Sequence, residues 1–407
     1  MLYIDNAEFK DAQIMKKDRE KYLSEDSSIK VISKIDELEV IRGFWEKMQW
    51  HPDADIDFYL DFIDSHQGFA RPHVILLSKD GQPSALMIGR IQEVPLDWRI
   101  GYKIVYKTPA RSLEIPYGGI LGDLSYPNCM ALVKELMNCL ARGEADVVFL
   151  NHLKCDSSIY RVAKKMPSFL CRDHSSFKNP HWRLSLPDSF NEFYRQRSKN
   201  SRSNIRKYAK RMKKTYGENL SIRCFQEKDA IDQAIRDIET IAAKTYQRGL
   251  GVGFINSPET RRKWILAAEH QRYRVYVLYL EEKPCAFWTG YPYNRTFFAD
   301  TTGYDFDYRY YHPGMFLFMR IIEEFCNEQN IEAIDFGFGD AEYKKQYSSQ
   351  NWQESCVYIF APTFKGVQVN AIRTLIVVTS QIAKTALNRF EALGWIKKKW
   401  RCHLTPK

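Results

Sequence analysis

The sequence lacks long hydrophobic runs. No stretch reaches the roughly 18 apolar residues that a membrane-spanning helix requires, and residues 1–21 contain no apolar core of the kind that marks a secretion signal. We therefore expect a cytoplasmic protein. The chain has enough apolar residues for a hydrophobic core, because 44% of the 407 residues are hydrophobic and 14% are aromatic. This composition predicts a globular chain that is long enough for two domains.

Motifs of several enzyme and metal-binding classes are also missing. The nine cysteines include no C-x-x-C pair and lie mostly within apolar runs, so we expect reduced core residues and no metal site. Neither a P-loop nor a dinucleotide-binding glycine fingerprint is present. A G-x-S-x-G turn and a Cys/His pair at a known family spacing are absent too, which argues against kinases and hydrolases.

Acidic residues are missing from one segment, residues 195–214, which holds ten Lys and Arg residues. Outside it, the 50 remaining basic residues balance 50 acidic residues, so this segment accounts for the net charge of +10. Its spacing predicts a helix with a basic stripe, which is either an ordinary solvated face or an anion-binding surface. The anion would be coenzyme A phosphate, acidic polysaccharide, tRNA or anionic lipid. The candidate residues are Arg202, Arg206, Lys210 and Arg211.

The region from residue 273 to residue 344 carries the clearest pattern of structural elements. Three apolar, β-branched and aromatic runs at residues 275–280, 286–293 and 296–304 predict consecutive antiparallel strands. A helical stripe begins near Met315, and residues 331–336 predict a further strand. The free amides at a helix start attract anions, which makes the loop before this helix a candidate phosphate site. Its candidate residues are Arg309, His312 and Gly314.

Several motifs in this region together resemble one enzyme family. They are Gly303-Tyr304-Asp305, His312-Pro313-Gly314, the segment Asp335-Phe336-Gly337-Phe338-Gly339-Asp340, and Tyr343-Lys344. The pattern is similar to the CelD-like branch of the GNAT acyltransferases, which is associated with cell-envelope and exopolysaccharide synthesis. That branch is related to Fem-type aminoacyl transferases with two GNAT-like domains. The resemblance covers about residues 32–364, although only its second half has sharp motifs, and the usual GNAT loop spacing of Gln or Arg, two residues, Gly, one residue, Gly or Ala is absent.

The resemblance implies a mixed α/β fold made of two tandem GNAT-like domains, each a mostly antiparallel mixed sheet flanked by helices. In the first half, residues 31–50 and 130–141 predict helices, and residues 74–77 with 85–91 predict a hairpin. Residues 147–150 and 181–186 predict strands. We therefore expect four segments: a polar lead at 1–30, a first GNAT-like domain at 31–180, a motif-bearing GNAT domain at 181–366, and a tail at 367–407.

The tail predicts an amphipathic helix followed by a basic end at Lys397-Lys398-Lys399. Such a helix either packs back on the protein or lies on a membrane surface, which would place the protein peripherally at the inner membrane face. Nothing in the sequence sets the oligomeric state.

Acyl transfer from a thioester to an amine needs a base, donors for an oxyanion and an acid for the departing thiolate. The catalytic candidates are Asp335, Asp340, Tyr343 and Asp300. Either of the first two acids could orient or deprotonate the acceptor amine, and Tyr343 resembles the GNAT residue that protonates the thiolate. Lys344 is a candidate for holding a phosphate or carboxylate. Each also has a structural alternative, as a capping carboxylate or a packed aromatic side chain.

The sequence thus predicts an acyltransferase that moves an acyl group from acyl-CoA, such as acetyl-CoA, to an amine or hydroxyl by direct attack in a ternary complex. The expected acceptor is a small molecule or a glycan precursor of the envelope or an exopolysaccharide. A Fem-type transferase that uses aminoacyl-tRNA is one alternative, in which the basic helix binds tRNA. The other is a non-catalytic, degenerate GNAT module that binds an anionic polymer, and the missing loop glycines support it.

Overall fold

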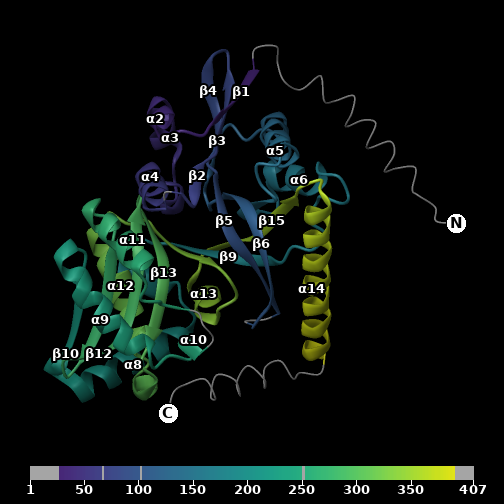
Figure 1. Ribbon diagram of the computed structural model, residues 1–407. Helices are drawn as coiled ribbons and strands as arrows, with labels where there is room; N and C mark the ends of the chain where they lie inside the picture. Colours follow the sequence, from purple (N-terminus) through teal and green to yellow (C-terminus); the bar gives the residue numbers. More distant parts are fainter. Residues whose placement is uncertain (1–26, 67, 101–102, 250–252, 390–407) are drawn as a thin grey trace. The chain divides into compact units, whose positions relative to one another are not determined.

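The computed structural model describes residues 27–66, 68–100, 103–249 and 253–389. The chain forms two compact units, whose elements are labelled in Figure 1. Unit 1 contains the chain up to Ile100, Ile104–Lys178 and Glu354–Val378. Unit 2 is formed mainly by Asn179–Gln353. Each unit is described by itself below.

Unit 1 contains two sets of paired strands. The first has the order β1-β3-β4-β7, with β1 (Ser27–Ile32), β3 (Val74–Lys79), β4 (Gln82–Met87) and β7 (Ile120–Gly122). The second has the order β15-β8-β6-β5-β2, with β15 (Gln350–Phe360), β8 (Val147–Lys154), β6 (Lys103–Ile115), β5 (Arg90–Ile100) and β2 (Ala70–Pro72). The main helices are α3 (Arg42–Met48), α4 (Ile56–Ser65), α5 (Tyr126–Ala141) and α6 (Ser158–Lys165).

The core of unit 1 follows from the helical pattern of α5. Leu132, Val133, Leu136 and Leu140 recur at helical spacing and are all buried, and they belong to one cluster with apolar residues of β3, β4 and β8. The predicted helix at 130–141 and strand at 147–150 are therefore confirmed.

The predicted helix over residues 31–50 is wrong at its start. Residues 27–32 form β1, which pairs antiparallel with β3 from Ser27 opposite Lys79 to Ile32 opposite Val74. The helical part is divided into α2 (Ile35–Leu38), a 3-10 turn and α3. The β-branched pair Val31-Ile32 joins the strand because sheet pairing satisfies its backbone groups and buries Ile32.

Unit 2 contains a sheet with the order β10-β11-β12-β13-β14-β9. Its strands are β9 (Lys178–Ser185), β10 (Leu220–Phe225), β11 (Arg274–Leu280), β12 (Lys283–Tyr293), β13 (Thr296–Tyr304) and β14 (Ala333–Phe338). The helices are α7 (Phe190–Arg195), α8 (Lys199–Tyr216), α9 (Ile231–Ala242), α10 (Tyr246–Gly249), α11 (Pro258–Glu269), α12 (Pro313–Glu328) and α13 (Glu342–Tyr347). The predicted order of three antiparallel strands, a helix and a strand is confirmed by β11, β12, β13, α12 and β14.

Helix α12 covers one face of this sheet. Its side chains Phe316, Phe318 and Phe325 are buried in one cluster with Trp288 and Phe297 from the strands. Trp288 stacks on Phe318 with ring centroids 4.9 Å apart. Helix α9 packs against β11, β12 and β13, and Figure 1 shows it next to these strands. Because α12 packs on the strands in this way, its first turn is held beside the sheet.

The long helix α14 (Phe364–Arg389) packs along part of its length into unit 1. Asn370 donates hydrogen bonds of 3.0 Å to the carbonyls of Leu170 and Arg172, and Arg373 pairs with Asp173 at 2.6 Å. Leu375 and Ile382 are exposed. No described helix is long and apolar enough to cross a membrane. The membrane-surface alternative stays a prediction, and Lys397-Lys398-Lys399 lies outside the described residues.

The predicted segment boundaries and the structural units differ at one end. The predicted second domain covered residues 181–366, whereas Glu354–Val378 lies in unit 1. The reason is that β15 pairs antiparallel with β8, from Glu354 opposite Lys154 to Phe360 opposite Val147. The chain thus returns to unit 1 after completing the sheet of unit 2. The predicted polar lead lies almost wholly outside the described residues.

Candidate functional site

Strands β13 and β14 of unit 2 separate soon after they meet. Their parallel register consists of three residue pairs, from Thr296 opposite Ala333 to Phe298 opposite Asp335. β13 continues to Tyr304 and β14 to Phe338, while the other edges of the two strands pair with β12 and β9. Beyond the third pair, the facing backbone groups of β13 and β14 do not pair with each other. An extended ligand with amide groups can hydrogen-bond to strand backbone of this kind.

Helix α12 begins next to the end of β13. His312 precedes it in the left-handed conformation with φ 52°, and Pro313 is its first residue. A Cβ atom added to Gly314 would come no closer than 3.6 Å to any other part of the protein, the nearest atom being Cδ1 of Tyr304. The helix start is therefore open to close approach, and the amides of its first turn have no partner within the helix. This arrangement suits an anion.

The turn before α12 is held by a buried carboxylate. Asp305 is 3% exposed, accepts a hydrogen bond of 3.0 Å from the amide of Asp307, and pairs with Lys244 at 2.6 Å. Arg309, a predicted phosphate ligand, lies 4.4 Å over the Phe306 ring and donates to the Phe306 carbonyl at 3.2 Å. Both contacts are within the turn itself, so Arg309 lies along its own loop.

The basic helix α8 packs against this same turn. The Tyr208 ring stacks on the His312 ring with centroids 3.7 Å apart, and Arg211 donates to the Tyr310 carbonyl at 2.6 Å. Burial lowers the pKa of His312 below its ordinary value, and the charges of Arg211 and Lys207 lower it further. The structure therefore joins two clusters that the sequence analysis treated separately, and the start of α12 is electropositive.

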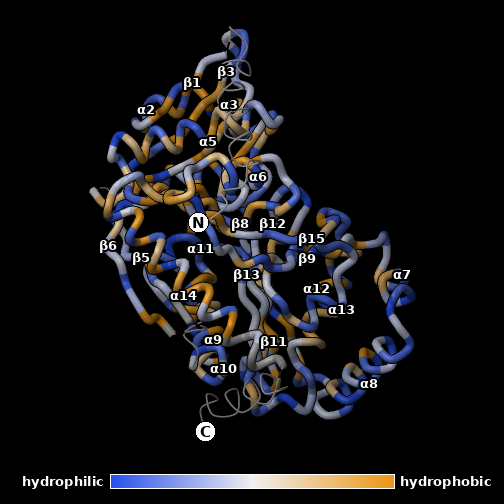
Figure 2. The backbone as a smooth tube through the Cα atoms, turned by 90° about the vertical axis from the view of Figure 1, so that its right-hand side faces the viewer, coloured by the Kyte–Doolittle hydropathy of each residue, from blue (hydrophilic) through white to orange (hydrophobic). Residues whose placement is uncertain are grey.

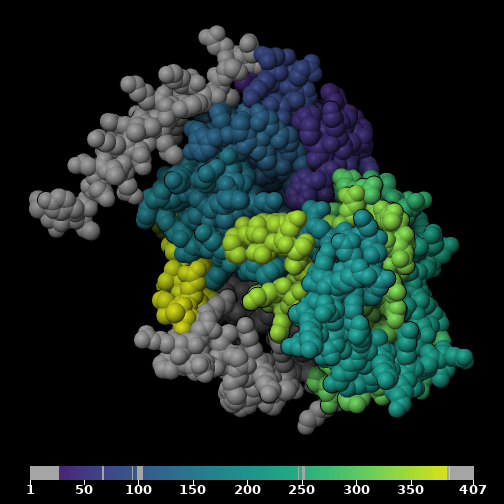
Figure 3. Space-filling model, turned by 180° about the vertical axis from the view of Figure 1, so that it is seen from behind, coloured from purple at the N-terminus to yellow at the C-terminus, as the bar shows by residue number. Residues whose placement is uncertain are grey.

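The cations of α8 differ in their surroundings. The helix buries Ser201, Ile205 and Met212 and is otherwise strongly hydrophilic, as its blue trace in Figure 2 shows. Arg202 donates to two carbonyls of the preceding turn, those of residues 195 and 197, so it has a structural role. Lys210 is exposed. Teal residues, which include α8, form much of the visible surface of unit 2 in Figure 3.

A small cavity of about 170 Å³ lies between α7, α8 and α12. Arg206 of α8 and Met315 of α12 both line it. The guanidinium group of Arg206 also lies 5.2 Å over the Tyr194 ring. The remaining lining residues are Phe190, Tyr194, Ile205, Tyr208, Ala209, Phe316, Met319, Arg320 and Glu323.

Asp335 is the last residue of β14 that pairs with β13, and it is 4% exposed. Its Oδ1 accepts hydrogen bonds from His181 Nε2 at 2.7 Å and from the Gly337 amide at 2.8 Å. His181 is itself fully buried and stacks on Trp352, with ring centroids 4.4 Å apart. Because both lone pairs of this oxygen are engaged and the group is buried, Asp335 positions the turn after β14. It is not exposed to take a proton from a substrate.

Lys344 lies beside that turn. Its Nζ donates to the carbonyls of Phe336 at 2.5 Å and Phe338 at 2.9 Å, across Gly337, which has φ 67°. Burial lowers the pKa of Lys344 to about 8, although the carboxylate of Asp335 acts in the opposite direction. This lysine was predicted to hold a phosphate or carboxylate. In the structure its ammonium group binds two backbone carbonyls of the motif.

The remaining catalytic candidates lie in different places. Tyr343 is half-buried in α13 and meets Trp288 edge-on at 5.7 Å, on the face of the sheet that α12 covers. Asp300 is exposed on β13 with Thr289 Oγ1 at 3.5 Å, and Ala299 beside it packs toward the α12 core. Strand alternation therefore directs Asp300 to the opposite face. Asp340 is exposed in the loop after β14.

The sequence analysis missed His181 as a site residue. It predicted a strand from residue 181 but linked nothing in it to Asp335. The link arises because β9 pairs antiparallel with β14, a long-range contact between distant parts of the chain. No local spacing carries that information.

The range from α8 to α13 also matches a known family. Residues 199–345 match the family model described as acetyltransferase (GNAT) domain. Residues 199–345 are therefore similar to a GNAT acetyltransferase domain. The match begins at the first residue of α8 and ends within α13, so it contains the open start of α12, the separated strands and the Asp335 to Lys344 motif. No curated protein sequence matches the chain significantly.

Several solved structures resemble most of the chain. A crystal structure of FemX matches with a TM-score of 0.50 at 10% identity, over 81% of this chain and 96% of that one. A tandem GNAT protein from the clavulanic acid biosynthesis pathway has a TM-score of 0.46 at 8% identity, over 83% and 99%. L-PGS from Bacillus licheniformis has 0.45 at 14%, over 80% and 98%. The likeness to FemX concerns the fold alone. The predicted fold class, mixed α/β with two tandem GNAT-like domains, is confirmed.

Proposed function

We propose that unit 2 binds acyl-CoA and transfers its acyl group to an amine or hydroxyl of a small acceptor. The observation that carries this proposal is the start of α12. An open helix N-terminus at Gly314, cations of α8 beside it and two strands that separate nearby occur together in one domain. The match of residues 199–345 to a GNAT domain supports acyl transfer, and the identity of the donor is the further step.

The two parts of the donor suit two features of the site. A pyrophosphate needs amide donors and positive charge, which the first turn of α12 and residues Arg206 and Arg211 supply. The arm between the nucleotide and the thioester is extended and contains amides, so it suits the backbone groups of β13 and β14 beyond Phe298 and Asp335. The thioester would then lie near the end of β14, close to the Gly337 to Lys344 motif.

The reaction is direct acyl transfer. The acceptor nitrogen or oxygen attacks the thioester carbonyl, a new bond to the carbonyl carbon forms, and the carbon–sulfur bond breaks. The acceptor loses one proton and the departing thiolate takes one. We assign Tyr343 as the proton donor to sulfur, since its phenol lies on the α12 face of the sheet. Asp335 and Lys344 act through the turn that they hold.

The base that accepts the proton of the attacking amine or hydroxyl should be an exposed acid of the motif region. Asp340 is exposed in the loop after β14, where water or an incoming amine can reach it, whereas Asp335 is buried. Asp300 is the other exposed carboxylate among the four catalytic candidates, on the opposite face of the sheet. We therefore favour Asp340 for this role. The acceptor class, a sugar or a precursor of the envelope or an exopolysaccharide, rests on the family resemblance of the motifs.

The exposed part of α8 supports the second candidate, a Fem-type transferase that uses aminoacyl-tRNA. Lys210 and other cations of this helix face solvent, as a surface for nucleic-acid phosphates would. Under this alternative, neutralising Lys210, Lys213 and Lys214 reduces the salt dependence of tRNA binding. Under the acyl-CoA proposal, tRNA does not bind in a saturable way at physiological salt. A degenerate binding module would instead bind anionic polymer and show no turnover with any donor.

The test is acyl-CoA consumption, followed by release of free thiol, with a panel of amino sugars and other amines. We expect wild-type turnover, and a kcat about 100-fold lower for Tyr343→Phe with unchanged donor affinity. Tyr160→Phe, in α6 of unit 1, is the matched control and should keep full activity. Full activity in Tyr343→Phe would remove the assigned acid, and no turnover with any acceptor would favour one of the alternatives.

A further inference from the structure

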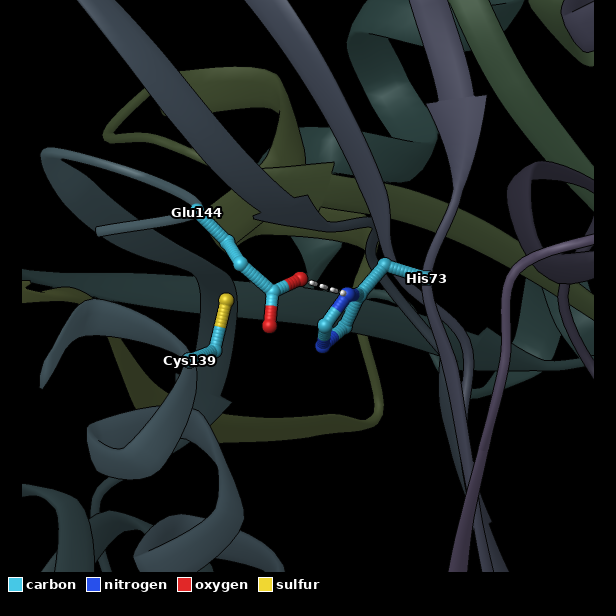
Figure 4. A group of neighbouring side chains, drawn as sticks. All are labelled: His73, Cys139 and Glu144. Atoms are coloured by element: carbon cyan, nitrogen blue, oxygen red, sulfur yellow. Dashed lines mark ion pairs between the residues drawn. The ribbon is translucent and has the colours of Figure 1, made fainter. Parts of the chain in front are cut away.

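Three side chains that belong to different parts of unit 1 converge on one buried space. They are His73, between β2 and β3, Cys139, in the last turn of α5, and Glu144, just after that helix. One ligand atom from each lies within 4.8 Å of the others. Figure 4 shows the imidazole, the thiol and the carboxylate pointing toward a common centre. None of the three takes part in the acyl-transfer proposal.

The imidazole of His73 is the unusual member of this cluster. His73 is 0% exposed, and neither Nδ1 nor Nε2 has a hydrogen-bond partner among the described residues. Its Nδ1 lies 3.7 Å from Oε2 of Glu144, which is too far for a hydrogen bond. Buried polar groups are nearly always paired, so two orphaned nitrogens in one ring indicate a missing partner.

The other two members are held in place by the backbone and by arginines. The Glu144 amide donates to the Cys139 carbonyl at 3.1 Å, across a turn in which Gly143 has φ 72°. Arg142 Nε donates to Oε1 of Glu144 at 2.7 Å, and Arg71 donates to Oε2 at 3.3 Å. These contacts orient the carboxylate, as outer partners do around metal ligands. Cys139 is fully buried, so its sulfur faces only this cluster and the core.

We propose that His73, Cys139 and Glu144 bind one divalent cation of the zinc class. Nitrogen, thiolate sulfur and carboxylate oxygen are the three ligand types of Zn²⁺, and this set matches no other common ion as well. Binding replaces the thiol proton of Cys139 with the metal and releases it to water, while a water molecule fills the fourth position. Tetrahedral coordination requires the ligand atoms to move together by about 1 Å.

The surroundings set limits on this site. The positive charges of Arg71 and Arg142 act against the cation, so we expect weaker binding than at a site with several thiolates. The sequence analysis expected no metal because the ligands follow no known spacing. The fold brings them together, since β3 and α5 belong to one core. A bound ion would tie the end of α5 to the junction of β2 and β3 and stabilise unit 1.

The test is a titration of chelator-treated, full-length protein with Co²⁺, which reports thiolate ligation by a near-ultraviolet charge-transfer band. We expect one equivalent to bind with this band and Zn²⁺ to displace it. Cys139→Ser should lose the band. Glu144→Gln, at a partly exposed side chain, should weaken binding at least tenfold. Cys129→Ser is the matched control, because Cys129 lies in the same helix and is equally buried.

Stability provides the second readout. Zn²⁺ should raise the Tm of the wild type and of Cys129→Ser, and should leave that of Glu144→Gln nearly unchanged. The wild-type titration decides the proposal even if Cys139→Ser does not fold. Absence of the band in the wild type, or an undiminished band in a folded Cys139→Ser or Glu144→Gln protein, would overturn it.

Discussion

Two helices of the molecule invite comparison, α5 of unit 1 and α12 of unit 2. Each has 16 residues and a proline at its first or second position, and each is followed by a strand, β8 or β14, that pairs in parallel with an earlier strand. Their starts differ. At α5, Asp123 accepts hydrogen bonds from the Ser125 amide at 3.0 Å and from Asn128 at 2.9 Å, and it pairs with Lys79 at 3.2 Å.

The start of α12 has the opposite character. Tyr310 stands three positions before the first helical residue, where Asp123 stands before α5, and Arg211 lies 4.0 Å over its ring. At α5, the hydrogen bond from the Ser125 amide is the main cause that lowers the pKa of Asp123. The carboxylate of Asp123 therefore lies at the helix start, where an external anion would bind. The start of α5 thus carries an acid of the protein itself, whereas the start of α12 carries a tyrosine and an arginine. This difference supports the proposed location of the donor site in unit 2.

The largest expected effect separates the acids of the two units. Asp335→Ala leaves His181 and the Gly337 amide without their shared acceptor in a buried place, and we expect a loss of about 3 kcal/mol in the free energy of unfolding. Asp123→Ala removes a largely exposed carboxylate and should cost about 0.5 to 1 kcal/mol. Denaturant unfolding of both variants measures the difference. Equal losses would contradict a buried positioning role for Asp335.

Charge reversal next to α12 should affect binding almost as strongly. The double variant Arg206→Glu with Arg211→Glu replaces two cations near the first turn, and we expect coenzyme A affinity about 100-fold lower. Lys79→Glu, next to Asp123 at the start of α5, is the control and should change the affinity less than twofold. Calorimetric titration provides both values. A comparable loss in the control would place the donor in unit 1.

A smaller effect is expected from converting one helix start into the other. Tyr310→Asp places a carboxylate at the position that Asp123 has before α5, where it can pair with Arg211 and occupy the amides of α12. We expect coenzyme A affinity about tenfold lower, with a Tm that is unchanged or slightly higher. Tyr310→Phe keeps the ring without the charge and should bind normally. Unchanged affinity in Tyr310→Asp would show that the anion does not bind at this helix start.

The smallest effect concerns the pH dependence of stability. The pKa of Lys344 is about 8 in the folded protein, below the ordinary lysine value of about 10.4, so the unfolded chain binds more protons between these two pH values. Stability should therefore rise with pH from 8 toward 9.5 in the wild type relative to Lys344→Met, by at most about 1.36 kcal/mol per pH unit. Parallel curves for the two proteins would contradict the burial of this amine.

Local pattern accounts for much of the fold in unit 2. The runs at 275–280, 286–293 and 296–304 became β11, β12 and β13 because β-branched and aromatic residues alternate there around short turns. The stripe from Met315 became α12, and the basic segment became α8 from Lys199 onward, with Arg195 at the end of α7. In each case neighbours in the sequence determine the element, so a local pattern is sufficient.

The features that the sequence could not provide all depend on distant contacts. Pairing of β9 with β14 brings His181 to Asp335, and pairing of β15 with β8 returns the chain to unit 1. The stacking of Tyr208 on His312 joins the basic helix to the α12 start. Of the predicted site residues, Arg211 contacts the turn before Gly314, and Arg206 lines a cavity with Met315. Asp335 and Lys344 hold the backbone of the motif, and Asp300 lies on the other face of the sheet.

The most direct measurement is a calorimetric titration of the wild type, Gly314→Ala and Gly43→Ala with coenzyme A. A methyl group at Gly314 finds only an ordinary 3.6 Å contact within the protein, so the variant should fold normally while the methyl occupies the space a pyrophosphate needs. Gly43 in α3 of unit 1 has nothing within 4 Å and is the matched control. We predict saturable binding to the wild type and the control, and affinity at least tenfold lower in Gly314→Ala with an unchanged Tm. No binding to the wild type, or equal binding to all three proteins, would contradict a donor site at the start of α12.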